Sequence, residues 1–268
     1  MSIVVERVGP GATVQDPGRR GFMHLGVPRG GPLDPALFER VRASLGNAPE
    51  AASVELPWHR ARFRALAPTV VSVDGDARLL ADGEVFEVDA APHAVRYVGL
   101  RGGVDVPVAL GGRGTLLVAG VGGLDGRMLR AGDVLRAGSL VAGDAFAPSP
   151  LVRDEGAAIA IHVCDDVPAE LAEALVAGAF EVTTRVDRVG MRLRGELPRL
   201  PHATGVSVPL VRGAIEATPD GELIVMGPDH PTTGGYAVAA VVAARDRGAL
   251  AQRRPGAAVR FERFRARG

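Results

Sequence analysis

The chain has 268 residues, 47% of them hydrophobic, and its 31 basic and 31 acidic residues give a formal net charge of zero. No global field attracts nucleic acid or an anionic membrane, so we expect neither as a partner. The single cysteine excludes an internal disulfide, the chain start lacks a signal-peptide pattern, and no apolar run is long enough to span a bilayer, so we expect a cytoplasmic protein.

All 31 basic residues are arginine, and lysine does not occur in the sequence. This composition excludes a biotinyl-lysine carrier, a Schiff base, a P-loop lysine against nucleotide phosphates and a Ser-Ser-Lys amidase centre. The exclusions hold whatever the cause of the bias, of which a GC-rich genome is the simplest.

Short, Val-rich segments bounded by Gly, Pro or Asp predict strands along most of the chain. Their number and spacing are typical of barrels or sandwiches, and the many Gly and Pro residues between them indicate turns. The predicted strands are residues 2–8, 69–74, 85–88, 94–100, 116–118, 159–163, 180–184, 223–226 and 258–261.

Three segments have a helical pattern. Residues 35–45 follow Asp34, a natural N-cap, and end at Gly46; residues 169–177 follow Asp165-Asp166. The third, 237–246, is expected to be helical, although its valines leave a strand possible.

Two mainly β domains are predicted, residues 1–148 and 149–268, divided at the Pro-rich break 147–150. A weak internal echo supports two related domains: the Asp/Arg/Gly run at 14–19 is followed by Val27-Pro28, and that at 186–190 by Val208-Pro209. Duplication and a chance match between turns both explain this echo.

A Gly/Pro-rich run near the N-terminus gathers Asp16, Arg19, His24 and Asp34 within twenty residues. One interpretation is the rim of a pocket, in which an Arg fork binds a carboxylate or phosphate and an Asp orients it. The alternative is an Asp-Arg pair that only stabilises a turn. The density of such residues favours a functional role for the cluster as a whole.

Further along the chain, the glycines at 120–122 do not match the dinucleotide-binding fingerprint because Asp125 stands where glycine is needed. In this segment Arg113 remains as a possible ligand contact.

In the second half, Asp187-Arg188 repeats the Asp/Arg chemistry, and residues 229–236 suggest an anion nest or an ordinary Thr helix cap. The six histidines are scattered without metal-binding spacing, so no metal site is predicted.

Several runs occur in the order seen in one protein family, and together they span nearly the whole chain: QDPGRRGFMHLGVP, LGNAPEAASVE, GGVDVPVALGGRGT, GRMLRAGDVL, DRVGMRL, PDGELIV, TTGGYAVAAV and AQRRPG. The chain thereby resembles the biotin-dependent carboxyltransferase / allophanate hydrolase subunit 2 family, and in particular its KipA-like members. The resemblance implies tandem cyclophilin-like β-barrel domains with a few short helices.

The resemblance also implies a component of a multi-subunit enzyme. Together with a KipI-like partner and a LamB/YcsF-like partner, it is implied to cleave 5-oxoproline, a small cyclic amide, to glutamate at the expense of ATP. The chain is expected to be inactive alone. ATP and Mg²⁺ are expected to bind with the KipI-like partner, and no covalent biotin is expected on this chain.

The family motifs imply two groups of site residues. In this interpretation arginines hold the substrate carboxylate and a phosphorylated lactam oxygen, while aspartates orient the attacked centre or a Mg²⁺ ion. The implied catalytic residues are Asp16, His24, Asp34, Asp187 and Asp229; the substrate-binding residues are Gln15, Arg19, Asn47, Arg188, Arg192, Thr232, Thr233 and Tyr236, with Arg113 added from its own loop.

The chain departs from the family pattern in several loops. Relatives usually carry serine at the positions of Gly30, Gly112 and Gly114, glutamine at Glu216, and Arg-Gln at His230-Pro231. The alternative functions are therefore a urea or guanidine carboxylase or allophanate hydrolase subunit 2 component, and a non-enzymatic KipA-type regulator that binds a KipI-like inhibitor.

Overall fold

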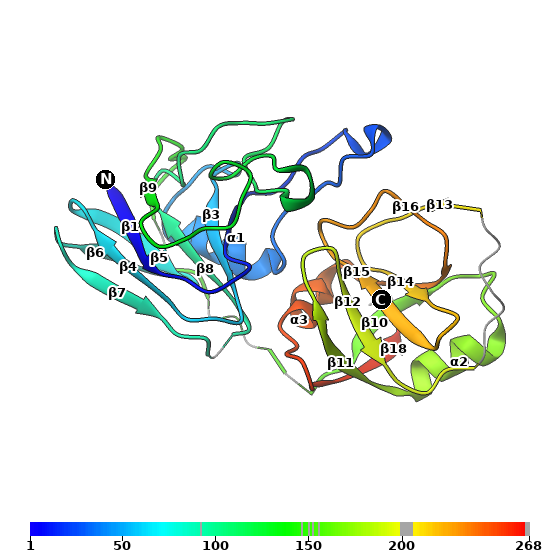
Figure 1. Cartoon of the computed structure of the whole chain (residues 1–268). Helices are drawn as coiled ribbons and strands as arrows, with labels where there is room; N and C mark the ends of the chain where they lie inside the picture. Colours follow the sequence, from blue (N-terminus) through cyan, green and yellow to red (C-terminus); the bar gives the residue numbers. More distant parts are fainter. Residues whose placement is uncertain are drawn as a thin grey trace. The chain divides into compact units, whose positions relative to one another are not determined.

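The protein is described by a computed structural model (Figure 1) that covers residues 1–91, 93–145, 147–149, 151, 153–154, 156–198 and 206–265. The chain divides into two compact units. The first comprises Met1–Arg20 and Gly30–Val152, and the second comprises Gly21–Arg29 and Arg153–Gly268. The predicted Pro-rich break lies just before this division, and its last residue, Pro150, lies outside the described residues.

The first unit contains two antiparallel sheets. In one the strand order is β7-β4-β1-β9, and in the other it is β2-β3-β8-β5-β6. The strands are β1 (Ser2–Arg7), β2 (Thr13–Gln15), β3 (Ser53–Pro57), β4 (Ala61–Ala65), β5 (Thr69–Val73), β6 (Asp76–Leu80), β7 (Val85–Val88), β8 (Val95–Leu100) and β9 (Val134–Arg136).

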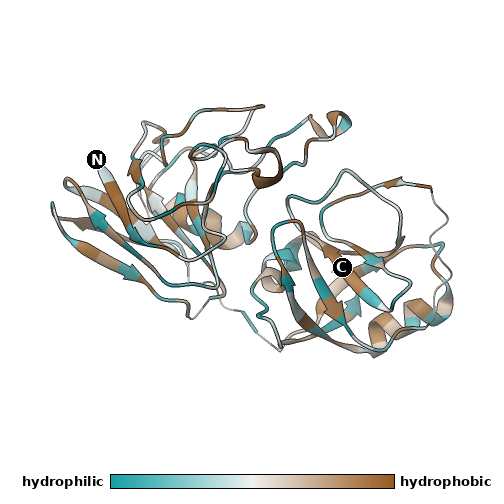
Figure 2. Ribbon diagram, in the orientation of Figure 1, coloured by the Kyte–Doolittle hydropathy of each residue, from teal (hydrophilic) through white to brown (hydrophobic). Residues whose placement is uncertain are grey.

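Alternation of apolar and polar residues places one face of these strands in the core. Along β4, Ala61, Phe63 and Ala65 are buried, whereas Arg62 and Arg64 are exposed and pair with Glu6. The same alternation is visible along the strands in Figure 2. The buried faces of both sheets contribute to one continuous hydrophobic core.

Helix α1 (Pro35–Ser44) packs against β8 and β6 of the second sheet. Its start is encoded locally, because the Asp34 carboxylate accepts from the Leu37 N–H at 3.2 Å and proline at the first position needs no hydrogen-bond partner. Gly46 follows the end of the helix with φ +61°, a conformation that favours glycine.

The second unit is built around a closed seven-stranded barrel of order β10-β17-β14-β15-β12-β11-β18. Its hydrophobic core fills the barrel and includes Leu171 and Leu175 of helix α2. The barrel strands are β10 (Ile159–Val163), β11 (Ala179–Val186), β12 (Gly190–Arg194), β14 (Ala214–Ala217), β15 (Glu222–Met226), β17 (Ala237–Val242) and β18 (Ala258–Arg263); the other elements are α2 (Ala169–Ala177), the β13–β16 pair (Val208–Pro209 and Thr233–Gly234), the 3₁₀ helix η3 (Ala244–Asp246) and α3 (Arg247–Ala251).

The mainly β architecture and the two longer helices are confirmed, as are eight of the nine predicted strands, all within the described residues. The strand at 116–118 is wrong: residues Leu117–Ala119 form a 3₁₀ turn (η2) closed by Gly120 in the left-handed conformation. The expected Asp165-Asp166 cap of α2 is also wrong, since Pro168 precedes the helix and no side chain caps it.

The helix predicted at 237–246 is likewise wrong. Its first part is strand β17, which pairs with β10 on one edge and β14 on the other, and only Arg247–Ala251 beyond it is α-helical. Two ladders of backbone hydrogen bonds outweigh the helix propensity of the alanines, and the valines suit a half-buried barrel strand. Among the described residues, no helix combines the length and apolar character needed to cross a bilayer.

Candidate functional site

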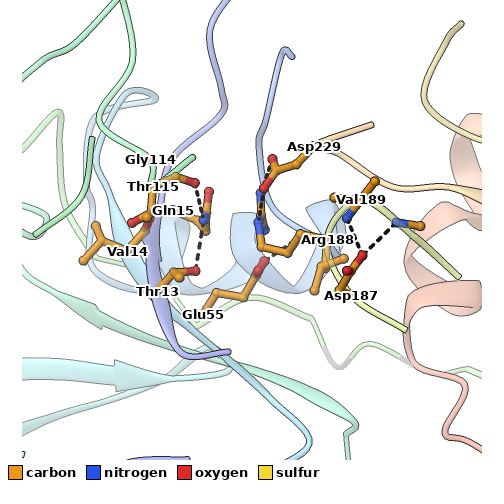
Figure 3. A network of polar contacts seen from close by, with 12 residues as sticks. Thr13, Val14, Gln15, Glu55, Gly114, Thr115, Asp187, Arg188, Val189 and Asp229 are labelled. Carbon is orange, nitrogen blue, oxygen red and sulfur yellow. Dashed lines mark hydrogen bonds and ion pairs between the residues drawn. The ribbon is translucent and has the colours of Figure 1, made fainter. Parts of the chain in front are cut away.

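Gln15, at the end of β2, has a buried side chain that fixes a distant segment of the first unit. Its amide nitrogen donates to the Thr13 hydroxyl at 3.0 Å and to the Thr115 carbonyl at 3.1 Å (Figure 3). The Thr115 N–H donates to the Val14 carbonyl at 2.8 Å, so main chain and side chain hold the same two segments together.

Asp16 is buried and accepts two backbone hydrogen bonds. One carboxylate oxygen accepts from the Gly18 N–H at 2.9 Å and the other from the Arg113 N–H at 2.6 Å. The Arg113 guanidinium itself donates to the Val106 carbonyl. Asp16 and Arg113, two residues of the predicted site, are therefore in direct contact where their two loops meet.

Arg19 is only 1% exposed, which is rare for arginine. Its Nε donates to the Ala109 carbonyl at 3.1 Å, and a terminal nitrogen donates to the Gly114 carbonyl. The Arg19 guanidinium thus binds backbone carbonyls of the same unit. These contacts stabilise the loops around it.

Glycines make room for this buried arginine. A Cβ at Gly112 would lie 2.8 Å from Arg19 Cγ, and one at Gly122 would lie 2.3 Å from an Arg19 terminal nitrogen. A Cβ at Gly114 would lie 2.8 Å from Gln15 Oε1 and 2.9 Å from Asp16 Oδ1. At Gly112 and Gly114, any side chain, including the serine expected from the resemblance, would require these neighbours to shift.

A buried polar network holds the entry to α1. Glu55 Oε2 accepts from the Leu33 N–H at 2.7 Å and from the Tyr97 hydroxyl at 2.6 Å, and that hydroxyl accepts from the Asp34 N–H at 3.0 Å. Burial, and then the Glu55 and Asp34 carboxylates, raise the pKa of Tyr97 well above its usual value. The phenol therefore remains a donor, and Asp34 has a structural role as an N-cap besides its expected catalytic one.

Asn47 and His24 are the two remaining predicted site residues in the first half of the chain, and neither takes part in the contacts described above. Asn47 is buried after α1, where its amide donates to the Leu100 carbonyl at 2.8 Å and accepts from the Gly102 N–H at 2.7 Å. His24 is exposed in the short 3₁₀ helix η1 (Met23–Leu25), a segment that belongs to the second unit.

In the second unit, Arg188 and Asp229 form a buried bidentate ion pair although 41 residues separate them. The Arg188 Nε and terminal nitrogen lie 2.8 and 3.0 Å from the two Asp229 carboxylate oxygens (Figure 3). The neighbouring Asp187 accepts from the backbone N–H groups of Val189 and Gly190, which closes the turn between β11 and β12. The pairing fixes the plane of the Arg188 guanidinium.

The helix cap suggested at 229–236 is wrong, because strand β17 follows this segment, and the suggested anion nest loses the support of a helix N-terminus. Thr233 pairs with Pro209 in the β13–β16 ribbon, and the Thr232 carbonyl accepts from the Leu210 N–H at 2.9 Å. Tyr236 is 40% exposed. Arg192, on β12, lies 3.3 Å from Glu222 Oε2 on the adjacent β15.

Glu216 on β14 carries a buried carboxyl group that sequence reasoning noted only as a departure. Its Oε1 has no hydrogen-bond partner in the structure, and a Cβ at Gly234 would lie 2.2 Å from that atom. The Tyr236 backbone N–H donates to the carboxyl group, yet burial raises the pKa of Glu216 above its usual value.

His230 is the second departure with a distinct environment. It is 1% exposed, and its Nδ1 lies 2.7 Å from the Pro231 carbonyl, to which it donates. Burial, together with Arg212 and Arg247, lowers the pKa of His230 despite the opposing effects of Pro231 and Asp229. The imidazole is therefore neutral at physiological pH.

A cavity of about 600 Å³ opens in the second unit beside α2, β17 and the β13–β16 ribbon. Its walls are mainly apolar and include Leu171, Val208 and Val238, with Tyr236, Cys164 and Asp166 as polar members. Of the predicted site residues, Tyr236 alone lines it among the described residues. Burial, and then Asp166 and Asp165, raise the pKa of the Cys164 thiol.

The predicted residues thus form distinct clusters within each unit. Gln15, Asp16, Arg19 and Arg113 meet in the first unit, whereas Arg188 and Asp229 meet in the second. Within the described part of the chain, no three His, Cys, Asp or Glu side chains are grouped as metal ligands.

Comparison with known proteins gives the context of this geometry. The family model described as carboxyltransferase domain, subdomain A and B, matches residues 25–263. The chain is 28% identical to urea amidolyase of Lachancea kluyveri, over 96% of this chain and 17% of that protein. It is also 28% identical to the C subunit of 5-oxoprolinase from Haemophilus influenzae, over 94% of this chain and 87% of that protein.

A solved structure, that of TTHA0988, has the same fold, with a TM-score of 0.85 and 30% identity over 97% of this chain. This chain spans 56% of the TTHA0988 chain, as well as the much smaller share of urea amidolyase given above.

Proposed function

Because the chain belongs to the carboxyltransferase domain family, subdomains A and B, we propose that it is one component of an ATP-dependent 5-oxoprolinase, which acts with a KipI-like partner to convert 5-oxo-L-proline to L-glutamate. One observation carries the proposal: the similarity to the C subunit of 5-oxoprolinase extends over most of both chains. The similarity to urea amidolyase, in contrast, covers a small part of a much longer protein.

The proposed chemistry needs activation of the lactam. An amide carbonyl is a poor electrophile. In the proposed reaction the terminal phosphoryl group of ATP, bound with Mg²⁺ in the complex with the KipI-like partner, would be transferred to the lactam oxygen, which releases ADP and activates the ring carbon. Water would then add to that carbon, the ring C–N bond would break and phosphate would be released, which gives glutamate. No residue of this chain is assigned to the metal, since no group of metal-ligating side chains is found in its described part.

The contribution of this chain is binding and orientation. Asp229 holds the Arg188 guanidinium in one plane, which orders a cation for the substrate carboxylate or a phosphoryl group before either binds. Asp16 is held by two backbone N–H groups at the corresponding loop of the first unit. The ordered Arg188 cation can stabilise a developing oxyanion, whereas the negative Asp16 carboxylate can orient a donor group.

The test uses the chain together with its KipI-like and LamB/YcsF-like partners. We expect 5-oxoproline-dependent glutamate formation that requires ATP, and a fall of at least tenfold in kcat/KM for Arg188→Lys, about 1.4 kcal/mol of transition-state stabilisation. Arg194→Lys is the matched control, since Arg194 is exposed at the end of β12, the strand that follows the Arg188 turn, and pairs at the surface with Glu181.

A second candidate function is a urea or guanidine carboxylase component, favoured by the similarity to urea amidolyase over 96% of this chain. It requires a separate biotinylated protein because this chain has no lysine. Urea-dependent ATP hydrolysis with a biotinylated partner, without glutamate formation from 5-oxoproline, would replace the first proposal by this one. If this chain binds the KipI-like protein but neither 5-oxoproline nor urea is turned over, the result would indicate the non-enzymatic KipA-type regulator.

A further inference from the structure

The carboxyl group of Glu216 lies on the outer face of the barrel in the second unit. Ile215 and Ala217, its neighbours on β14, belong to the hydrophobic core inside the barrel. Because side chains alternate along a strand, Glu216 points to the opposite, outer face. It is nevertheless only 3% exposed, so another segment of the chain covers it.

The β13–β16 ribbon provides that cover. A Cβ at Gly234, on β16, would lie 2.2 Å from Glu216 Oε1 and 2.7 Å from Leu210 Cδ1, so the Gly234 backbone packs directly on both side chains. The Tyr236 backbone N–H, two residues later, donates to the carboxyl group. The Leu210 N–H donates to the Thr232 carbonyl at 2.9 Å, which joins the two sides of the ribbon beside the carboxyl group.

The surroundings of this carboxyl group are apolar. Ile224 and Val238, the residues that pair with Glu216 on β15 and β17, are half-buried and pack against a small hydrophobic cluster that includes Leu210. Glu216 Oε1 is shielded from solvent and has no hydrogen-bond partner among the described residues. A neutral carboxyl group is tolerated in such a place at a modest cost, whereas an ionised oxygen without a partner costs far more.

The charged groups of the surrounding segments have other contacts. The ionisable residues on the neighbouring strands and on the loops that flank the ribbon are Glu222, Arg212, Asp229, His230 and Tyr236. Glu222 forms ion pairs with arginines on β11 and β12, Asp229 is bound by the Arg188 fork, and the neutral His230 donates to a backbone carbonyl. The charge of Arg212 acts on His230. None of these groups is hydrogen-bonded to Glu216 Oε1.

We propose that the protonation state of Glu216 controls the packing of the β13–β16 ribbon: the neutral carboxyl group lets the ribbon lie on the barrel, and ionisation releases the ribbon so that water reaches the carboxylate. The raised pKa of Glu216 agrees in direction, since the packed state is then favoured at low pH and is lost as the pH rises through the folded pKa.

Release of the ribbon would change the cavity of the second unit. Val208 and Pro209 of the ribbon and Tyr236 just after it form part of the cavity wall. Movement of these residues away from β17 would widen the cavity, so the pH would set its accessibility. This inference does not rest on the proposed reaction.

Hydrogen–deuterium exchange of the purified full chain, followed by mass spectrometry, tests this control. Ribbon amides are compared between the wild type and Glu216→Gln at about pH 4.5 and about pH 8, because the ratio at one pH cancels the intrinsic pH dependence of exchange. At the lower pH the two proteins should exchange within about twofold of each other. At the higher pH the wild-type ribbon should exchange at least tenfold faster, since glutamine cannot ionise.

Two controls separate release of the ribbon from general unfolding. The amides of β12, in the middle of the barrel sheet, should exchange at the same rate in both proteins at each pH. Glu181→Gln removes an exposed carboxylate on β11 and should behave like the wild type, with faster ribbon exchange at the higher pH.

Gly234→Ala provides a second variant that does not change Glu216. Its methyl group would collide with Glu216 Oε1, so the ribbon should exchange rapidly at both pH values. Slow exchange of the ribbon in this variant at the lower pH would contradict the close packing on Glu216.

Equal ribbon exchange in the wild type and Glu216→Gln at both pH values would overturn the inference. An equal acceleration of β12 and the ribbon would also overturn it, because ionisation would then loosen the barrel as a whole. These measurements need no turnover, so their outcome is distinct from success or failure of the proposed reaction.

Discussion

At the scale of single residues, the buried Arg188–Asp229 pair is the best-defined member of the candidate site. Their side chains are 7% and 5% exposed, so neither charge is solvated if the other is removed. We expect Asp229→Asn to lower the free energy of unfolding by about 3 kcal/mol or more, the usual cost of breaking a buried pair. Urea denaturation measures this, and the exposed pair variant Glu181→Gln is the control.

A stability loss in Glu181→Gln as large as that in Asp229→Asn would show that the buried pair is not special. Activity measurements on Asp229→Asn are informative only for the fraction that remains folded. Circular dichroism at the assay temperature therefore accompanies them.

Glu216 gives a prediction about pH. Its pKa is raised in the folded state, so its contribution to stability is fully present below its unfolded pKa of about 4.3 and is lost as the pH rises through the folded pKa. Glu216→Gln removes this titration. We expect the melting temperature of the variant, relative to the wild type, to increase from pH 4 to pH 7, whereas a constant difference would contradict the raised pKa.

At the scale of elements, two substitutions at the N-cap of α1 can distinguish a structural from a catalytic role for Asp34. Asp34→Ala removes the cap hydrogen bond to Leu37 and should cost about 1 kcal/mol of stability. Asp34→Asn keeps an acceptor for that bond and should restore most of the loss. If Asp34 is catalytic as predicted, the asparagine variant stays inactive while its stability returns, and recovery of both would assign the residue to capping alone.

The loop around Gly114 gives a second prediction for an element. Gly114→Ala places a methyl group within 3 Å of Gln15 and Asp16 and should destabilise the fold by about 1 to 3 kcal/mol through overpacking. Gly143→Ala is the matched control, because a Cβ there meets nothing within 4 Å. Equal melting temperatures of the two variants would mean that the 112–115 loop can move to accommodate a side chain.

At the scale of the whole molecule, the proposed function requires a complex. We expect the purified chain alone to show no 5-oxoproline-dependent ATP hydrolysis above background, and the activity to appear when the KipI-like and LamB/YcsF-like proteins are added. Phosphate release and glutamate formation are measured in the same samples. Robust turnover by the isolated chain would contradict this dependence on partners.

The sequence alone determined the features that depend on neighbouring residues. Asp34 and Pro35 specify the start of α1, and Val-rich runs such as Val85–Val88 specify strands, because caps, turns and side-chain alternation act over a few residues. The lack of lysine excludes several chemistries without any structure. The order of motifs along the chain indicates the family, which the comparison confirmed.

The tertiary structure decided what depends on distant partners. The segment Ala237–Val242 is a strand because β10 and β14 offer hydrogen bonds on both of its edges, and no local signal reports them. The pairing of Arg188 with Asp229, the enclosure of Arg19 by carbonyls and the unpartnered Oε1 of Glu216 likewise follow from chain segments that meet only in the fold. The sequence specifies which side chains are ionisable, but tertiary packing determines how far each one is solvated and which partner it has.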